Sequence, residues 1–253
     1  MKLTQDVRTY WEGTPCGTLP EIVGDAAALT PEWFERVEAY RYAVEPFIHS
    51  VAQFTRHRGR RVLEIGVGAG TDHLQWARAG AECHGVDLTD AAIEITRARL
   101  AHYGLASALQ RVNAEAIPYD DAFFDIVYSW GVIHHAEHPE RVIAEVRRVL
   151  RPGGQFIGMF YSRRSLVALR FWVRHALLAG RPWRSLRDVI WHHMESAGTR
   201  CYTAAELREL FGGFTQVQVI PLLTTYDTAY LPGWLARLLP DALGWFLAVR
   251  ATR

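Results

Sequence analysis

Three glycines at alternate positions close the first strongly apolar run of the chain. Gly66, Gly68 and Gly70 follow residues 62–65, and a helical pattern begins directly after them. Because glycine lacks a Cβ atom, such a turn lets the backbone approach a ligand closely at the carboxyl end of a strand. Asp87 ends the next apolar run, 17 positions after Gly70, where its carboxylate can accept hydrogen bonds from two ribose hydroxyls. This pair indicates a ligand that contains a nucleoside, and nicotinamide and flavin cofactors stay open at this point.

The charge beside the turn narrows this choice. The glycine spacing is GxGxG, not the GxGxxG of dinucleotide sites, and Glu64 stands two residues before the first glycine. A carboxylate at this place disfavours a pyrophosphate, but it suits a ligand that carries a sulfonium and an α-amino group. These features favour S-adenosylmethionine as the cofactor.

The elements around the turn alternate between strand and helix. Apolar runs predict strands at 61–65, 82–86, 108–112, 124–129, 155–161, 215–220 and 244–251. Amphipathic segments between the first five runs predict helices, and alternation of this kind implies a parallel sheet covered on both faces. The predicted fold class is therefore α/β, a Rossmann-like, doubly wound and mostly parallel sheet.

Two segments lie outside this alternation. Residues 1–57 precede the first strand and are expected to form an N-terminal helical lid or strap, with helix beginning near Thr30. Residues 58–253 are expected to form the main domain. Within it, residues 162–200 are rich in Arg and Trp and predict a helical cap inserted after the fifth strand. A capping box from Thr203 to Glu206 marks the start of the next helix.

Composition limits the remaining possibilities. With 253 residues, 49% of them hydrophobic, the chain can bury one large α/β core. Its formal net charge of +1 offers no general attraction for nucleic acid, which is not an expected partner. Three separated cysteines outside any CxxC motif, and a start without an apolar signal region, favour the cytoplasm. No run predicts a membrane span, and the oligomeric state stays open.

The motifs of the first 160 residues resemble, in order and spacing, those of class I S-adenosylmethionine-dependent methyltransferases. The similarity is greatest to the ubiquinone/menaquinone-biosynthesis-like, methyltransferase type 11 branch, and it covers roughly residues 58–161. It is carried by residues 62–71, 85–88, 125–129, 132–135 and 149–154. The resemblance implies a seven-stranded sheet with an antiparallel last strand. It also implies metal-independent methyl transfer to a small-molecule acceptor, apolar or anionic in character.

The resemblance further assigns expected roles to single residues. It implies that Gly66 and Gly68 pack on the methionine and ribose parts of the cofactor, that Asp87 holds the ribose, and that Leu88 covers the adenine. The expected cofactor-binding residues are Glu64, Gly66, Gly68, Gly70, Asp87, Leu88, Asn113, Ala114, Glu115 and Trp130.

Methyl transfer from a sulfonium needs positioning more than activation, because the leaving group is already activated. His134 and Tyr161 follow or end the fourth and fifth strands, and they are the candidate catalytic residues, His134 as a base. For each of them a purely structural role is the alternative. The candidates for acceptor contacts are Tyr10, His135, Arg163, His193 and Tyr202. No metal site is expected, because neighbouring histidines on a helix diverge by about 100°.

Other functions remain compatible with these motifs. The same cofactor site could serve intramolecular cyclisation or aminocarboxypropyl chemistry that releases methylthioadenosine, and a binding protein without catalysis could keep the fold. The arginines and aromatic residues within 162–200 could form a basic aromatic surface for an anionic lipid or a carboxylated substrate. A solvated face is the simpler interpretation of that charge run.

Overall fold

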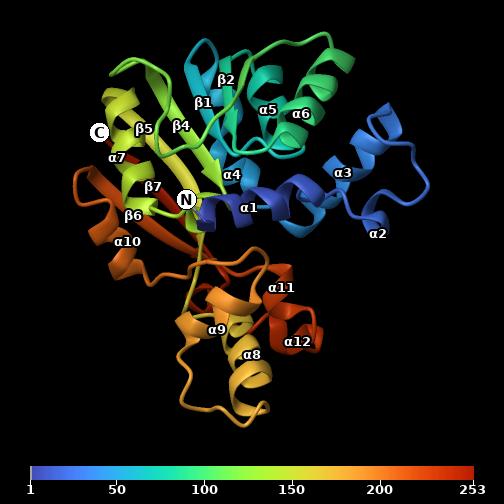
Figure 1. Cartoon of the computed structure of the whole chain (residues 1–253), viewed down its shortest axis with the longest axis vertical. Helices are drawn as coiled ribbons and strands as arrows, with labels where there is room; N and C mark the ends of the chain where they lie inside the picture. Colours follow the sequence, from blue (N-terminus) through green and yellow to red (C-terminus); the bar gives the residue numbers. More distant parts are fainter. Residues whose placement is uncertain (1) are drawn as a thin grey trace.

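Seven strands form one sheet at the centre of the computed structural model, which describes residues 2–253 (Figure 1). The strands are β1 (Arg61–Ile65), β2 (Glu82–Asp87), β3 (Ala108–Arg111), β4 (Phe124–Trp130), β5 (Leu150–Tyr161), β6 (Thr215–Leu222) and β7 (Phe246–Thr252). Their order across the sheet is β3-β2-β1-β4-β5-β7-β6. β7 is antiparallel to both of its neighbours, whereas the pairs among β1 to β5 are parallel. The predicted fold class is therefore confirmed.

The strand order places a ligand crevice near the middle of the sheet. β1 lies between β2 and β4, so the chain first runs from the centre to one edge and then returns to build the other half. This reversal is the switch point beyond whose carboxyl ends ligands bind in open α/β sheets. The turns that follow Ile65 and Trp130 both leave the sheet at this crevice.

Both faces of the sheet are buried, so the central strands need apolar residues at nearly every position. In β4, Tyr128 and Trp130 face the core shared with α5 (Thr71–Arg78), whereas Val127 faces the core shared with α7 (Pro139–Val149). Residues that alternate along a strand point to opposite faces, which explains this division. The remaining helices that cover the sheet are α4 (Ile48–Ala52), α6 (Asp90–His102) and α10 (Ala204–Leu210). The predicted capping box opens α10.

The first helix lies across the carboxyl edge of the sheet (Figure 1). α1 (Lys2–Gly13) precedes α2 (Pro20–Val23) and α3 (Pro31–Val44), and only the start of α3 at Thr30 was expected from the sequence. Val7 is the one residue of α1 that is buried, so the helix lies largely at the surface. It is held at α6, where Arg8 pairs with Asp90 at 2.8 Å and Glu12 accepts the amide of Ala91 at 2.8 Å.

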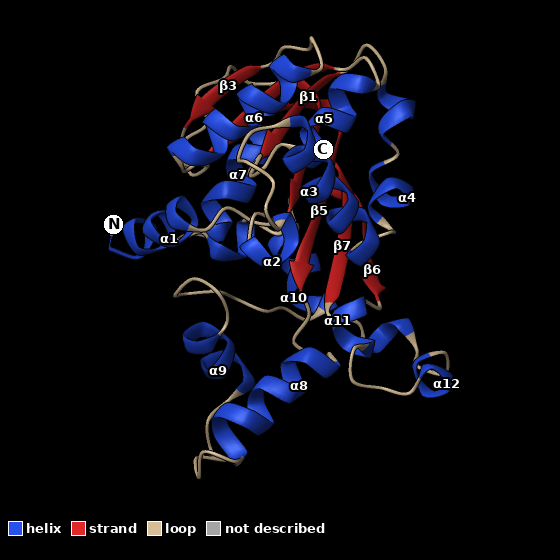
Figure 2. Ribbon diagram, turned by 90° about the vertical axis from the view of Figure 1, so that its right-hand side faces the viewer, coloured by secondary structure: helices blue, strands red, loops and turns tan. Residues whose placement is uncertain are grey.

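A lobe of short helices lies beyond the end of β5 (Figures 1 and 2). We call it the lower lobe and define it as residues 162–200 and 223–245. It contains α8 (Leu166–Trp172), a π-helical turn (Val173–Leu177), α9 (Leu186–His193), α11 (Thr225–Thr228) and α12 (Gly233–Ala236). The inserted helical segment was predicted, but α11 and α12 were not, because each is a single turn between Pro and Gly residues. Within residues 2–253, no helix is both long and apolar enough to cross a membrane.

One strand boundary differs from its prediction. β5 begins at Leu150, directly after α7, although the strand was expected to begin at Gln155. The end of the chain pairs with this earlier part: the amide of Gly153 donates to the carbonyl of Arg253 at 3.1 Å, and the amide of Arg253 donates to the carbonyl of Gly154 at 3.0 Å. A register shift between β4 and β5 absorbs the irregular stretch.

Candidate cofactor and acceptor site

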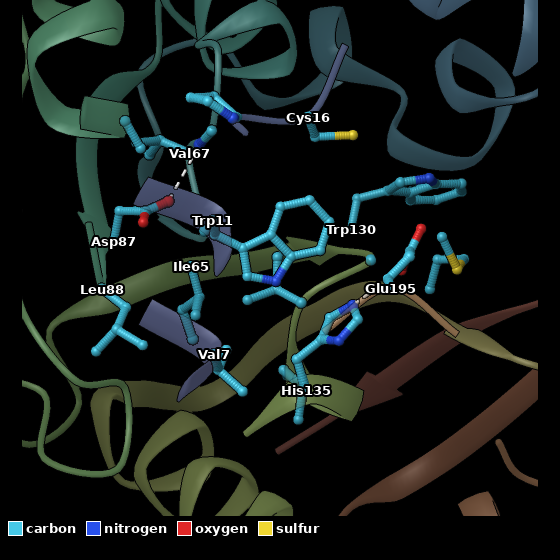
Figure 3. A pocket seen from close by; sticks show the side chains of 18 of the residues that line it. Val7, Trp11, Cys16, Ile65, Val67, Asp87, Leu88, Trp130, His135 and Glu195 are labelled. Carbon is cyan, nitrogen blue, oxygen red and sulfur yellow. Dashed lines mark hydrogen bonds and ion pairs between the residues drawn. The ribbon is translucent and has the colours of Figure 1, made fainter. Parts of the chain in front are cut away.

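A cavity of about 400 Å³ lies at the carboxyl edge of the sheet, beneath α1 (Figure 3). Its walls come from the turn after β1, from the ends of β2 to β5, from α1 and α3, and from α8 and α11 of the lower lobe. In Figure 3, Asp87 and Leu88 lie on one side, His135 and Glu195 lie on the other, and Trp11 lies between them in this view. A volume of this size is typical of small-molecule sites.

The three glycines of the turn have different surroundings. All three have positive φ, at 81° for Gly66, 52° for Gly68 and 73° for Gly70. A Cβ atom on Gly66 would lie 2.2 Å from Val132, and one on Gly70 would lie 2.8 Å from the hydroxyl of Thr96. Neighbouring side chains therefore occupy the space that a side chain at either position would need. A Cβ on Gly68 would meet nothing within 4 Å. Gly66 and Gly68 line the cavity, whereas Gly70 packs on α6 and lies outside the lining.

Asp87 is held against this turn. Its Oδ2 accepts the amide of Gly68 at 3.1 Å, and its Oδ1 accepts both the amide and the hydroxyl of Thr89, at 2.9 and 2.8 Å. Burial raises the pKa of Asp87, and these three donors work in the opposite direction. The carboxylate is thereby fixed at the cavity wall beside the residue whose missing side chain leaves room for a ligand.

Glu64 forms a buried pair with His73, at 2.9 Å between Oε2 and Nδ1. The hydroxyl of Ser107 donates to the carbonyl of Cys83 at 2.7 Å, so its oxygen must accept from His73 Nε2, 2.8 Å away. One further proton therefore lies between Nδ1 and Glu64. Burial lowers the pKa of His73 to about 4 and raises that of Glu64. With one proton shared between them the pair carries no net charge, so Glu64 does not provide the free negative charge that was expected to favour a cationic ligand.

Two further carboxylates, Glu45 and Asp72, line this end of the cavity. Arg41 of α3 lies between two carboxylates, 2.7 Å from Asp72 and 3.0 Å from Glu45. The indole of Trp130 donates to Glu45 at 2.6 Å, and Tyr128 donates to Asp72 at 2.9 Å. Two carboxylates thus surround one guanidinium beside the turn, and burial raises the pKa of Glu45. Carboxylates at this place suit the cationic methionine end of S-adenosylmethionine. No local pattern in the sequence reveals this network, because α3 and α5 meet only in the fold.

The expected adenine side is also part of the cavity wall. Leu88, Asn113, Ala114 and Glu115 all line it. The side-chain oxygen of Asn113 accepts the amide of Glu115 at 3.0 Å, and Glu115 accepts the amide of His138 at 3.0 Å. These contacts fix the loop after β3 in one conformation, with its side chains along one side of the ligand space.

At the opposite end, three polar side chains meet. The hydroxyl of Tyr161 lies 3.1 and 3.0 Å from the two carboxylate oxygens of Glu195, and Glu195 lies 3.4 Å from Nε2 of His135. Burial and then the charge of Glu195 raise the pKa of Tyr161, so the phenol stays protonated and donates. The indole of Trp11 meets the ring of His135 edge-on, with centroids 5.3 Å apart. We call Tyr161, Glu195 and His135 the acceptor-end triad.

The orientation of His135 follows from its other nitrogen. The hydroxyls of Thr199 and Ser196 both lie 3.0 Å from Nδ1 of His135. The neutral ring carries one hydrogen: on Nδ1 it points to these oxygens, and on Nε2 it points to the carboxylate of Glu195. A hydrogen on Nδ1 leaves Nε2 free to accept one.

Six of the proposed site residues lie outside the cavity lining. Besides Gly70, they are His134, Tyr10, Arg163, His193 and Tyr202. His134 is fully buried and neither ring nitrogen has a hydrogen-bond partner; burial holds its pKa well below the usual value. Arg163 is paired with Glu206 at 2.8 Å, and His193 stacks on His175 with centroids 4.2 Å apart.

Two residues that line the cavity, Trp11 and Glu195, were not among the site residues expected from the sequence. Trp11, next to the proposed Tyr10, faces inward together with Thr4 and Val7. Their spacing of three and then four residues is the signal of one helical face, so it could have identified Trp11. Glu195 offers no such signal. It sits in the turn after α9 with φ at 43°, a conformation that is uncommon for residues other than glycine.

The described residues contain no group of three or more His, Cys, Asp or Glu side chains placed to hold a metal ion.

Comparison with known proteins agrees with this geometry. Residues 63–158 match the family described as a methyltransferase domain. A ubiquinone/menaquinone biosynthesis C-methyltransferase of Bordetella avium is 35% identical over 160 residues, 58% of this chain and 61% of that protein. A phthiotriol/phenolphthiotriol dimycocerosates methyltransferase of Mycobacterium ulcerans is 36% identical over 140 residues, 54% of this chain and 49% of that protein. The chain thus spans roughly half of these relatives' length.

Solved structures share the fold over most of the chain. An S-adenosylmethionine-dependent methyltransferase from Mesorhizobium loti has a TM-score of 0.60 at 18% identity, covering 82% of this chain and 97% of that one. The [4+2]-cyclase SpnF has a TM-score of 0.58 at 20% identity, covering 99% of this chain and 92% of that one. Residues 63–158 thus form a methyltransferase domain, and the sheet has the fold of S-adenosylmethionine-dependent methyltransferases, which implies S-adenosylmethionine as the cofactor.

Proposed function

We propose that the chain transfers a methyl group to a small-molecule acceptor that binds between Trp11 and the acceptor-end triad, without a metal ion. The observation that carries this proposal is a single cavity with two unlike ends. One end has Gly68 and Asp87, and the other has Tyr161, Glu195 and His135. Donor and acceptor sites that share one enclosed space allow the close approach on which methyl transfer depends.

The residues of the first end would hold the cofactor. Asp87 and Leu88 would contact its nucleoside part, and the open space at Gly68 leaves room for it. The network of Arg41, Asp72 and Glu45 would face its methionine part, where carboxylates complement a cation. When bound, S-adenosylmethionine supplies a methyl group activated by its sulfonium.

The acceptor-end triad would orient the acceptor and receive its proton. In the tautomer with its hydrogen on Nδ1, Nε2 of His135 would accept the proton that an acceptor O–H, N–H or C–H loses, and Glu195, 3.4 Å away, would stabilise the imidazolium. Tyr161 holds the carboxylate in place through its hydroxyl. Glu195 is 32% exposed, so the proton can return to solvent. We assign the base role to His135 instead of His134, because His134 lies outside the cavity lining.

The strain at Glu195 supports a functional role. A left-handed backbone at a residue other than glycine costs about 1–3 kcal/mol and persists where the surroundings enforce it. Here Gly198 donates to the carbonyl of Trp191 at 3.1 Å, and the hydroxyl of Thr199 lies 2.7 Å from the carbonyl of Ser196 and 3.0 Å from that of Met194, which closes the turn and directs Glu195 into the cavity.

The walls near the triad favour an acceptor that is largely apolar. Val167, Phe171, Met194 and Trp245 surround this part of the cavity, and Arg170 adds a cation. An aromatic or aliphatic compound with one hydroxyl, amine or activated carbon, and with an anionic group near Arg170, fits these walls. The names of the two relatives, for ubiquinone/menaquinone biosynthesis and for phthiotriol dimycocerosates, support an organic acceptor of this kind.

Calorimetry and product analysis test the proposal. The protein should bind S-adenosylmethionine and S-adenosylhomocysteine, and a panel of phenols, quinols and apolar carboxylates should reveal transfer of a labelled methyl group that a chelator does not affect. Release of methylthioadenosine without an acceptor would instead indicate cyclisation or aminocarboxypropyl chemistry. Tight binding without turnover on any probe would favour a binding protein, and absence of cofactor binding would overturn the proposal.

A further inference from the structure

The lower lobe exposes large apolar side chains to an extent that the rest of the molecule does not. Among residues 2–253, five large apolar side chains are between 69% and 78% exposed, and every other one is at most 50% exposed. All five lie in the lower lobe: Leu178, Trp183, Tyr230, Trp234 and Leu238. Single exposed apolar residues are ordinary, but a concentration of the most exposed ones marks a surface that contacts something other than water.

These residues belong to two neighbouring segments. Residues 177–183 form the tip beyond the π-helical turn, and each of them is exposed. Residues 228–240 surround α12. The guanidinium of Arg170, in α8, lies 4.5 Å from the ring centroid of Tyr230, which joins the two segments. Figures 1 and 2 show α8, α9, α11 and α12 together, on the side of the molecule away from β1 and β2.

The charges around these two segments are basic. Residues 165–187, which include the first segment, contain five arginines, residues 228–240 contain one, and neither stretch contains Asp or Glu. Of these arginines, Arg184 and Arg187 pair with Asp188 and Glu206. Because the whole chain has a net charge of +1, the remaining residues carry a net charge of −5. Within the described part of the chain, the guanidinium groups of Arg174 and Arg181 have no ion-pair or hydrogen-bond partner. The protein is therefore electrically polar, with its cationic pole where its apolar side chains are exposed.

We propose that the lower lobe docks on the surface of an anionic lipid bilayer. Trp183, Leu178, Trp234 and Leu238 enter the headgroup layer, while Arg174 and Arg181 lie against lipid phosphates. Peripheral proteins are held at such a surface by exposed Trp and Leu side chains together with unpaired arginines. A second copy of the chain is a weaker occupant, because two cationic poles repel each other.

Docking would bring the cavity to the lipid. α8 contributes Val167 and Phe171 to the cavity wall, and α11 contributes Tyr226, so the helices that carry the docking surface also enclose the acceptor end. An amphiphilic acceptor could then move from the bilayer into the cavity without crossing water. This last step rests on the proposed function, whereas the docking itself does not.

Co-sedimentation with lipid vesicles tests the docking. The full chain is mixed with phosphatidylcholine vesicles, with or without phosphatidylglycerol, at low and high salt. We expect binding to the anionic vesicles at least about tenfold tighter than to neutral ones, and weakened by salt. The variants Leu178→Ala/Trp183→Ala and Arg174→Glu/Arg181→Glu should each lose roughly tenfold or more.

Matched variants elsewhere control for charge and apolar area. Arg97→Glu/Arg208→Glu changes two other exposed arginines by the same charge, and Leu19→Ala/Leu29→Ala removes two exposed leucines outside the lobe. Both should bind anionic vesicles as the wild type does. Calorimetry with S-adenosylhomocysteine should give one affinity for all variants, so a failure of docking is separable from a failure of the proposed function.

Three results would overturn the proposal. The wild type could fail to sediment with anionic vesicles, the lobe variants could bind as tightly as the wild type, or binding could be equal on neutral and anionic vesicles. Light scattering that shows a dimer of the wild type, converted to a monomer by Leu178→Ala/Trp183→Ala, would also overturn it. In that case a second copy covers the surface.

Discussion

The two ends of the cavity are assembled in different ways. At the cofactor end, Gly68, Asp87 and Asn113 each follow or end successive strands of the sheet, so the strand order alone brings them together. At the acceptor end, Trp11, His135, Tyr161 and Glu195 come from α1, from the loop after β4, from β5 and from the inserted segment. The first end depends on one topology, whereas the second depends on how separate attachments pack on it.

This difference has a functional consequence. Residues at strand ends are held by the hydrogen bonds of the sheet, which a change in a loop or a surface helix does not disturb. The acceptor end can therefore vary through its attachments while the cofactor end stays the same. If the two ends are independent in this sense, substitutions at one end should leave the property of the other end unchanged.

The largest effect is expected at Asp87. Asp87→Ala removes the carboxylate proposed to hold the ribose and leaves the amide of Gly68 without its acceptor. We expect affinity for S-adenosylhomocysteine to fall about 100-fold or more, equivalent to roughly 3 kcal/mol, because hydrogen bonds to a charged group are lost. Asp87→Asn, which keeps the shape, should lose about tenfold. Titration calorimetry measures both, and wild-type affinity in the alanine variant would contradict the assignment.

A substitution at the opposite end should have the complementary effect. Glu195→Gln removes the charge that stabilises a protonated His135 and should lower single-turnover methyl transfer about 30-fold. Affinity for S-adenosylhomocysteine should stay within about threefold of the wild type, since Glu195 lies away from the cofactor end. The control is Asp188→Asn, a change of an exposed carboxylate in the same inserted segment. A large loss of cofactor affinity in Glu195→Gln would show that the two ends are coupled.

The sequence predicted the cofactor end because its signals are local. A strand, a glycine turn and a helix start are each encoded by neighbouring residues, and the doubly wound topology then places their ends side by side. The architecture was predictable for the same reason, apart from the start of β5 and the single-turn helices α11 and α12. The charge that complements a cation was attributed to Glu64, but in the structure its pairing with His73 neutralises it.

The acceptor end could be predicted only in fragments. Tyr161 and His135 follow from strand ends, but nothing in the sequence tells which of two neighbouring histidines faces inward. The backbone turn after β4 sends His135 to the cavity and buries His134 completely. Likewise Glu195 and Arg41 acquire their roles through contacts between distant segments, which no local pattern reports. Tertiary contacts of this kind lie beyond periodicity and spacing.

A pair of glycines offers a sharper test of the cofactor end. Gly68 and Gly104 both have positive φ, at 52° and 65°, and a Cβ on either would meet nothing within 4 Å. Gly68→Ala and Gly104→Ala should therefore cost a similar amount of stability, about 1 kcal/mol. Only Gly68 lines the cavity, so only its variant should weaken S-adenosylhomocysteine binding, by about 20-fold. Equal cofactor affinity in both variants would mean that the space at Gly68 is not occupied by the cofactor.

The smallest expected effect is on the pH dependence of stability, and it concerns the buried His134. Its pKa in the folded protein lies well below 6.5 because of burial, so the unfolded chain binds a proton there that the folded chain does not. Stability must therefore fall as the pH drops below about 6.5, by about 1.4 kcal/mol between pH 7.5 and 5.5 for one such group. His134→Phe keeps an aromatic ring against Tyr161 and should remove this part of the acid sensitivity, as measured by urea unfolding at the two pH values. His73 retains its own contribution in the variant, since its pKa is lowered to about 4.

The exposed His102 provides the control: His102→Phe should leave the pH dependence as it is in the wild type. An unchanged pH dependence in His134→Phe would mean that His134 titrates in the folded protein, and its exclusion from proton transfer would then fail.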